Sequence, residues 1–285
     1  MQRIAIMQGR LVAPTGGSIQ SFPRDRWREE FALAAAAGMD AIEWIYDVHG
    51  ADVNPLATDV GVAEMRTLSR QHGIAVVSLC ADYFLDRPFV RTSLDNVADL
   101  TERLHWLIGR CGQAGITRAV LPFVDASRID TPDDERRIHE VLRQTLPVCE
   151  ATGVELHLET SLAPRAFSSL LAQVPDRMLQ VNYDSGNSAS QGYDVASELA
   201  AYGTRIGSVH IKDRIRGGGT VPLGTGDADL PALFSGLAGL RYQGDYVLQV
   251  ARSTDGCEVE WARHNRAFLA FQLNRVHSST GNVGC

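Results

Sequence analysis

Eight short apolar segments recur along this chain, and each is separated from the next by a longer stretch with helical character. The segments are rich in Val, Ile and Leu, as parallel strands that are buried on both faces are. No Pro/Gly/Ser-rich linker divides the 285 residues. The pattern therefore predicts an α/β fold, a single (β/α)8 barrel or TIM barrel, with a doubly wound open sheet as the alternative. The predicted strands are Ile4–Met7, Ala41–Ile45, Ala75–Leu79, Ala119–Leu121, Val154–Leu158, Leu179–Tyr183, Ile206–Ile211 and Tyr246–Val250.

The segments between the strands carry helix signals. Apolar residues spaced by three and four form one stripe between Leu94 and Cys111. Thr131 and Pro132, followed by three acidic residues, are typical of a helix start. We expect the barrel to span residues 1–272 and residues 273–285 to form a flexible tail. Glycines in left-handed conformation are expected at four helix ends, namely Gly38, Gly73, Gly115 and Gly153.

Charge and cysteine content narrow the environment of the protein. Lys and Arg number 27 against 34 Asp and Glu, a net charge of −7, which argues against a basic face for nucleic acid or anionic membrane. The five cysteines are scattered, as in a reducing compartment, and no apolar run is long enough to span a bilayer. We expect a cytoplasmic protein with no nucleic-acid or membrane partner. A homo-oligomer is also compatible with the sequence, through apolar helix positions such as Trp27 and Phe31.

Polar residues stand at the carboxyl ends of four consecutive predicted strands, where a buried sheet would otherwise avoid them. Strand five ends at Glu159, strand six at Asp184, strand seven carries His210 and strand eight carries Gln249. In a (β/α)8 barrel these strand ends meet at one mouth. Two carboxylates and an imidazole that meet there repel unless a positive charge lies between them. The sequence therefore predicts a metal site with Glu159, Asp184 and His210 as ligands and Gln249 as a further oxygen donor.

A set of short motifs follows in a fixed order along the strands: Met7-Gln8-Gly9-Arg10-Leu11, Glu159, Asp184-x-Gly186-Asn187, His210-x-Lys212-Asp213 and Gly224-x-Gly226-Asp227. With these motifs the chain resembles the sugar phosphate isomerase/epimerase superfamily, which has a xylose isomerase-like TIM barrel, from residue 7 to about residue 271. The resemblance implies one divalent cation, commonly manganese, cobalt, magnesium or zinc. It also implies proton transfer next to the carbonyl of a small sugar or sugar phosphate.

One position departs from the family. Its ketose and ribulose phosphate epimerases carry a glutamate on strand eight that binds the metal and acts as a second base, and the matching residue here is Gln249. Glutamine offers an amide oxygen to a cation but accepts no proton at any useful pH. We expect a near-neutral metal site, a weaker hold on the metal, and chemistry that runs on one base. That base is Glu159, with His157 as the catalytic alternative if Glu159 is purely a ligand.

The sequence thus supports the hypothesis of a metal-dependent sugar or sugar-phosphate isomerase or epimerase, working by proton transfer through a metal-stabilised enediolate. A metal-dependent dehydratase or lyase acting on a keto-sugar or inosose is the alternative, as is a barrel that binds sugar without chemistry. An abasic-site endonuclease shares the barrel by resemblance, but it would need more histidines at the strand ends and a basic groove.

Six further residues are candidates for contacts with substrate. Glu43, at the end of strand two, is expected to face the mouth and bind a hydroxyl, or else to pair with Arg10. Tyr83 follows strand three and either stacks on a sugar or packs under Trp44. The other four lie beyond strands six to eight, and for Lys212 a solvated loop position is the alternative: Asn187, Lys212, Asp213 and Arg252.

Overall fold

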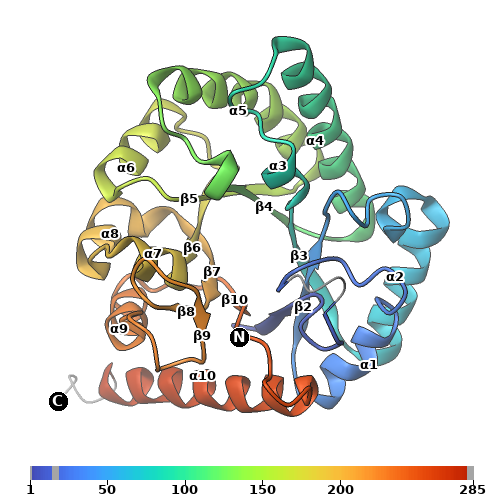
Figure 1. The fold of residues 1–285 in the computed structure, drawn as a ribbon, viewed down its shortest axis with the longest axis vertical. Helices are drawn as coiled ribbons and strands as arrows, with labels where there is room; N and C mark the ends of the chain where they lie inside the picture. The colour runs from blue at the N-terminus through green and yellow to red at the C-terminus, as the bar shows by residue number, and fades with distance from the viewer. Residues whose placement is uncertain (1, 15–18, 281–285) are drawn as a thin grey trace.

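Eight parallel strands close into a barrel, with the helices around its outside (Figure 1). The computed structural model describes residues 2–14 and 19–280. Around the barrel the strands follow the order β1-β10-β7-β6-β5-β4-β3-β2, which confirms the predicted TIM barrel and excludes the open sheet. The barrel strands are β1 (Ile4–Met7), β2 (Ala41–Ile45), β3 (Ala75–Cys80), β4 (Arg118–Phe123), β5 (Glu155–Thr160), β6 (Leu179–Asp184), β7 (Ile206–Ile211) and β10 (Tyr246–Leu248).

The helices alternate with the strands as the sequence indicates, and a small antiparallel ribbon is added on the β7 side. The ribbon consists of β8 (Asp213–Arg214) and β9 (Thr220–Val221) and frames the glycine-rich loop. The helices are α1 (Glu29–Ala36), α2 (Asp59–His72), α3 (Tyr83–Asp86), α4 (Leu94–Ala114), α5 (Pro132–Thr152), α6 (Pro164–Gln173), α7 (Ser185–Gln191), α8 (Val195–Tyr202), α9 (Leu230–Gly239) and α10 (Glu258–Thr280).

Local signals in the sequence set most of the helix ends. The side chain of Thr131 accepts a hydrogen bond from the Asp134 amide at the start of α5. The four glycines expected at helix ends have positive φ angles of 67° to 84°. The C-terminal boundary differs from the expectation, because α10 continues through residue 272 to Thr280, and Leu273 and Val276 pack against the core. The remaining tail, residues 281–285, lies outside the described residues.

The aromatic residues proposed as an oligomer face lie inside the molecule instead. Trp27 is 3% exposed and Phe31 is fully buried. Both rings pack against Trp44 of β2, at centroid distances of 5.7 and 6.0 Å. Burial of this cluster stabilises the contact between α1 and the barrel, so these two side chains are not available to a second subunit.

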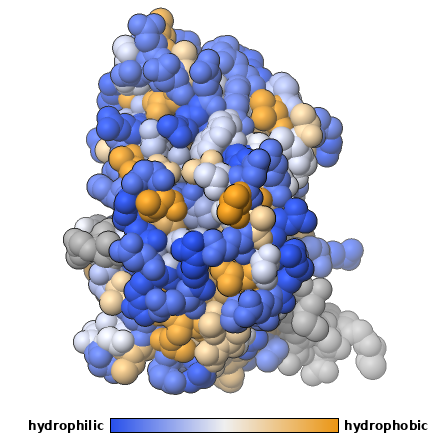
Figure 2. Space-filling view, turned by 90° about the vertical axis from the view of Figure 1, so that its right-hand side faces the viewer, coloured by the Kyte–Doolittle hydropathy of each residue, from blue (hydrophilic) through white to orange (hydrophobic). Residues whose placement is uncertain are grey.

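The outer surface shown in Figure 2 is mainly hydrophilic, and its apolar residues form several separate groups. Within residues 2–14 and 19–280, no helix combines the length and the apolar character that crossing a bilayer requires.

Parallel register brings the predicted site residues to one end of the barrel. Asp184 lies opposite His210 across the β6–β7 pair, and Glu159 is on β5, next to β6. Because side chains alternate along a strand, residues two apart point to the same side. His157 and Glu159 therefore both point to the barrel axis, at different depths.

Candidate metal centre and active site

Glu159, Asp184 and His210 converge at the mouth of the barrel, as the sequence predicted. One ligand atom from each residue lies within 4.8 Å of the others, and all three side chains are buried. Nδ1 of His210 is 3.1 Å from Oε2 of Glu159 and 3.8 Å from Oδ2 of Asp184. Two carboxylates and one imidazole form a donor set that suits a divalent cation such as manganese, cobalt or zinc.

The orientation of His210 strengthens this interpretation. Its Nε2 donates to Oε1 of Glu43 at 2.7 Å, and Ser78 Oγ donates to the other oxygen of Glu43 at 2.5 Å. The lone pair of Nδ1 is thus turned toward the two acids, where this buried atom makes no well-formed hydrogen bond with any described residue. In a metal-binding histidine, one ring nitrogen usually binds the metal while the N–H of the other donates to a carboxylate.

The raised pKa of His210 also shows that positive charge is favoured at this position. Burial alone would lower this pKa, but the carboxylates of Glu43, Asp184 and Glu159 raise it well above the ordinary value. A proton and a metal ion are alternative ways of supplying that charge at this position.

Glu43 therefore does not have the position expected from the sequence. Its side chain is fully buried inside the barrel, does not line the cavity and does not pair with Arg10. Its carboxylate accepts hydrogen bonds from Nε2 of His210 and Oγ of Ser78, and it holds the imidazole of His210 in place. Sequence spacing located Glu43 on the inner face of β2 but could not show how deep it lies.

A second hydrogen-bonded column supports Glu159. The Asn182 amide donates to Oε2 of Glu159 at 2.8 Å, and Oδ1 of Asn182 accepts from Ser208 Oγ at 2.6 Å. Because the Ser208 proton is used in that bond, Nδ1 of His157 must donate to Ser208 Oγ, 2.7 Å away. The column thus fixes the tautomer of His157 and runs from the barrel interior to the carboxylate of Glu159.

His157 lies one layer below the cavity and does not line it. Its other nitrogen, Nε2, is 3.1 Å from Glu155, and burial lowers its pKa. Within the described residues, the hydrogen bonds that lead from the His157 ring toward the mouth pass through Ser208 and Asn182, so the ring itself does not reach the cavity. It is a buried, hydrogen-bonded histidine beneath Glu159.

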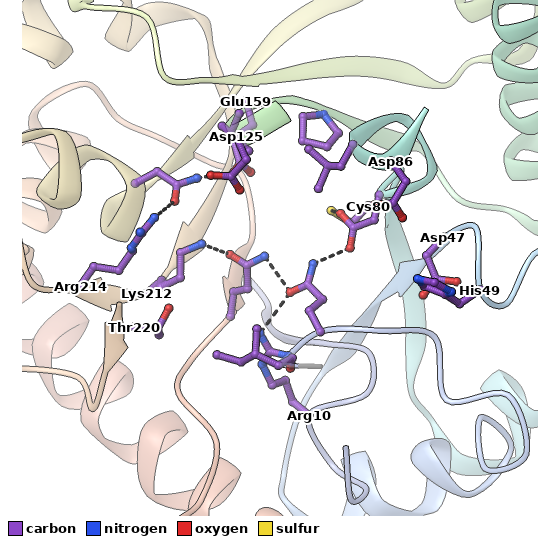
Figure 3. Close-up of a pocket in the computed structure, with 18 residues that line it drawn as sticks. Arg10, Asp47, His49, Cys80, Asp86, Asp125, Glu159, Lys212, Arg214 and Thr220 are labelled. Carbon is purple, nitrogen blue, oxygen red and sulfur yellow. Dashed lines mark hydrogen bonds between the residues drawn. The ribbon is translucent and has the colours of Figure 1, made fainter. Parts of the chain in front are cut away.

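A polar chain crosses the mouth from Asp184 to Asp82, and Figure 3 shows the part of it that begins at Lys212. Nζ of Lys212 is 2.7 Å from Oδ2 of Asp184 and donates to Oε1 of Gln249 at 2.7 Å. The Gln249 amide donates to Gln20 at 2.9 Å, and Gln20 donates to Asp82 at 2.7 Å. The amide oxygen of Gln249, expected to bind metal, is therefore directed to Lys212. Burial would raise the pKa of Asp184, but Lys212 and His210 hold it well below its ordinary value.

A cavity of about 390 Å³ opens above these residues and is wide enough for a small sugar. Of the residues proposed from the sequence, Glu159, Asn187, Lys212 and Gln249 line it. Asn187 also donates to Oε1 of Glu159 at 2.6 Å, so that both oxygens of this carboxylate are oriented by amides.

Three other candidates lie outside the cavity wall. The buried carboxylate of Asp213 accepts the amides of Gly224, Gly226 and Ala228 and fixes that turn. Arg252 donates to the carbonyl of Val12 and pairs with Glu258.

Tyr83 also lies away from the cavity. Its ring packs against Tyr46 at 5.5 Å and Phe84 at 5.4 Å, not under Trp44. Asp213, Arg252 and Tyr83 are thus each held by contacts within the protein.

Sequence reasoning missed several residues that build the site. Gln20, Asp86 and Asp125 line the cavity, and Asn182 and Ser208 align Glu159. A signal was present for Asp125, a polar residue just beyond strand four, and for Asn182 and Ser208, which place polar side chains within apolar strands. Gln20 lies in a long loop after β1, and no local sequence pattern indicates that it lines the cavity.

The loop after β1 is held by two buried ionisable side chains, Arg10 and Glu30. Arg10 donates through Nε to the carbonyl of Val250 at 3.0 Å, and burial together with nearby Arg252 lowers its pKa to about 10. Oε1 of Glu30 accepts the Gly9 amide at 2.7 Å, while its Oε2 is buried without a partner in the described chain. Burial raises the pKa of Glu30 to about 7.

Comparisons with known proteins agree with this geometry. A family model described as "Xylose isomerase-like TIM barrel" matches residues 31–270. A curated relative, "Putative L-ribulose-5-phosphate 3-epimerase SgbU" of Escherichia coli (strain K12), is 26% identical over 242 residues, which cover 79% of this chain and 83% of the relative.

Solved structures share the fold at low sequence identity. A structure of L-ribulose 3-epimerase superposes with a TM-score of 0.78 at 19% identity, covering 100% of this chain and 99% of that one. The IOLI protein with a bound zinc atom superposes with a TM-score of 0.77 at 16% identity, covering 96% and 99%. These neighbours bear out the barrel architecture.

Replacing Ser208 with alanine tests the column beneath Glu159. The change leaves the Nδ1–H of His157 and Oδ1 of Asn182 buried without partners, so we expect the free energy of unfolding to fall by about 1–3 kcal/mol. Urea unfolding followed by circular dichroism measures it. Ser235→Ala, on the exposed side of α9, is the matched control and should stay near the wild-type value. Equal stability of the two variants would contradict the column.

The pH dependence of stability tests Glu30. Folded Glu30 keeps its proton up to about pH 7 and unfolded Glu30 only to about pH 4.5, so the native state binds more protons between these values. The free energy of unfolding should therefore fall as pH rises through this window, by roughly 3 kcal/mol from this group. In Glu30→Gln this fall should be absent, whereas Glu29→Gln, an exposed neighbour, should keep it. Identical pH profiles for wild type and Glu30→Gln would contradict the assignment.

Proposed function

Because the chain belongs to the xylose isomerase-like TIM barrel family, we propose that it is a divalent-metal-dependent isomerase or epimerase of a small sugar. The observation that carries the proposal is the cluster of Glu159, Asp184 and His210, with a buried, unpartnered imidazole nitrogen aimed at two carboxylates beside a cavity. The epimerase relatives act by name on ribulose and its phosphate, which supports a sugar substrate. The three residues would hold the cation through Glu159 and Asp184 oxygens and Nδ1 of His210.

A divalent cation at this position, when bound, supplies Lewis acidity that polarises a carbonyl. The protein's own residues then determine where the proton goes. Glu159 is the carboxylate that both faces the cavity and is oriented by two amides, so it removes the proton from the carbon next to the carbonyl. The resulting enediolate is negatively charged, and the ammonium of Lys212 in the cavity wall stabilises it.

Gln249 restricts the return of that proton. Its amide cannot act as an acid or a base, and its oxygen already accepts from Lys212. Proton return from Glu159 to the same face transfers hydrogen along the carbon chain and gives isomerisation. Loss of water from the same intermediate gives dehydration, which makes a dehydratase the second candidate. Inversion at one carbon requires a donor other than Gln249.

Deuterium exchange tests the proposal. The protein is incubated with Mn²⁺ and a panel of ketoses and ketose phosphates in deuterated water, and the products are followed by NMR. We expect deuterium at a carbon next to the carbonyl, loss of exchange on chelation, and a fall of at least about 100-fold in Glu159→Gln, because general-base catalysis contributes on that order.

Glu150→Gln serves as the control, since this glutamate is exposed on α5 and pairs with Arg177 outside the site. NMR of the products separates the reaction types, because isomerisation moves the carbonyl, epimerisation inverts one stereocentre and dehydration removes a hydroxyl. The absence of exchange with every substrate in the metal-loaded wild type would overturn proton-transfer chemistry and favour a barrel that only binds sugar.

A further inference from the structure

The charges of the side chains that line the cavity, the proposed cation aside, are unfavourable for an anionic substrate. Among the described residues that line it, five are carboxylates and three are permanent cations. The carboxylates are those of Asp47, Asp82, Asp86, Asp125 and Glu159. A sugar phosphate carries close to two negative charges at neutral pH, so its phosphate would need a group of cations with hydrogen bonds to spare.

The three cations of the wall already have partners. Lys212 is paired with Asp184 and bonded to Gln249. Arg214 donates through Nε and Nη2 to the Gly218 carbonyl and through Nη1 to Asn187.

The third cation, Arg10, is 4% exposed and uses Nε, Nη1 and Nη2 on oxygen atoms of its own chain. Among the described residues, the wall therefore holds no cluster of cations with hydrogen bonds to spare.

The glycine-rich turns near the mouth are also occupied by the protein's own carboxylates. Turns of this kind bind phosphate through their backbone N–H groups. Here the amides of Gly224, Gly226 and Ala228 all donate to Asp213, which the turn surrounds so closely that a Cβ on Gly226 would lie 2.2 Å from the carboxylate.

In the second turn, in the Arg214–Thr220 loop, the backbone amides also donate to acceptors within the protein. The amide of Arg216 donates to Asp227, and those of Gly217 and Gly218 donate to backbone carbonyls. An internal anion thus stands at each turn where a phosphate group would otherwise bind.

Two carboxylates of the wall are left for a ligand. Both oxygens of Asp47 accept backbone amides, and Asp82 accepts from Gln20 and Cys80. The carboxylates of Asp86 and Asp125 are exposed and have no hydrogen bond or ion pair within the described part of the chain. Asp125 also has a φ of 48°, a strained backbone conformation of the kind found at ligand sites. Carboxylates accept hydroxyl protons, which a sugar offers in several directions.

We propose that the substrate is an uncharged polyhydroxy carbonyl compound, a free ketose or keto-polyol, whose hydroxyls are bound by Asp86 and Asp125, and that sugar phosphates are excluded. The reaction of this substrate rests on the proposed function, whereas the preference for an uncharged substrate does not. It distinguishes this protein from the relative named for a ribulose phosphate.

The first test compares matched pairs, L-ribulose with L-ribulose 5-phosphate and D-allulose with D-allulose 6-phosphate, on the Mn²⁺-loaded protein. We expect tighter binding by calorimetry and faster deuterium exchange for the free sugars, by roughly 100-fold, since like-charge contacts cost several kcal/mol. Tighter binding of the phosphates would overturn the inference. Lack of exchange in both classes with tighter binding of the free sugar would overturn the proposed reaction and leave the charge selection standing.

The dependence of sugar phosphate binding on ionic strength is an independent test. Repulsion predicts that sugar phosphate binding strengthens as ionic strength rises, whereas a phosphate site predicts that it weakens. Weakening would contradict the inference even if no variant folds.

The double variant Asp86→Asn/Asp125→Asn removes both charges while keeping the shapes. We expect the preference for free sugar over phosphate to fall by about tenfold. Asp95→Asn/Asp99→Asn, an equal change of charge on the exposed side of α4, is the control and should leave the ratio unchanged. An unaltered ratio in the first variant would exclude these two carboxylates as the selecting groups.

Discussion

The crowding of negative charge at the barrel mouth is the constraint on which this structure depends. Glu159, Asp184 and His210 lie close enough together to bind one ion. Glu43 adds a further buried carboxylate behind the histidine. Buried like charges at such distances are tolerated only where a cation compensates them. Lys212 and a protonated His210 supply part of that charge, and a divalent ion would supply it more completely. The proposed chemistry follows from this requirement, because the charge that stabilises the folded mouth is also the charge that stabilises an enediolate.

Rigidity at the mouth comes from buried polar columns beneath each functional group. The column through Ser208 and Asn182 orients Glu159, and the pair of Ser78 and Glu43 orients His210. Such supports hold reacting groups in position without rearrangement during the reaction. Because the columns lie on barrel strands and the cavity wall is built largely from loops, the proposed chemistry and the proposed choice of substrate depend on different parts of the chain.

The fold and the convergence of the three strand-end residues could be predicted because both depend on local pattern. Alternation of strand and helix identifies the barrel, and polar residues at strand ends identify Glu159, Asp184 and His210. The depth of Glu43 inside the barrel could not be predicted, because spacing along β2 shows only which side of the strand it occupies, and Glu43 was therefore expected to face the mouth. Hydrogen bonds between a strand end and a later loop could not be predicted either. Asp213 appeared to be a substrate ligand because nothing local shows that three amides from a later turn surround it.

The central claim is that the acids at 159 and 184 and the imidazole at 210 share one cation. Anomalous diffraction from crystals grown with Mn²⁺, recorded on both sides of the manganese absorption edge, tests it most directly. The account predicts one strong peak at about 2.0–2.3 Å from a carboxylate oxygen of each acid and from Nδ1 of His210. A map with no peak among these three residues at saturating manganese, or with a peak held by other side chains, would contradict it.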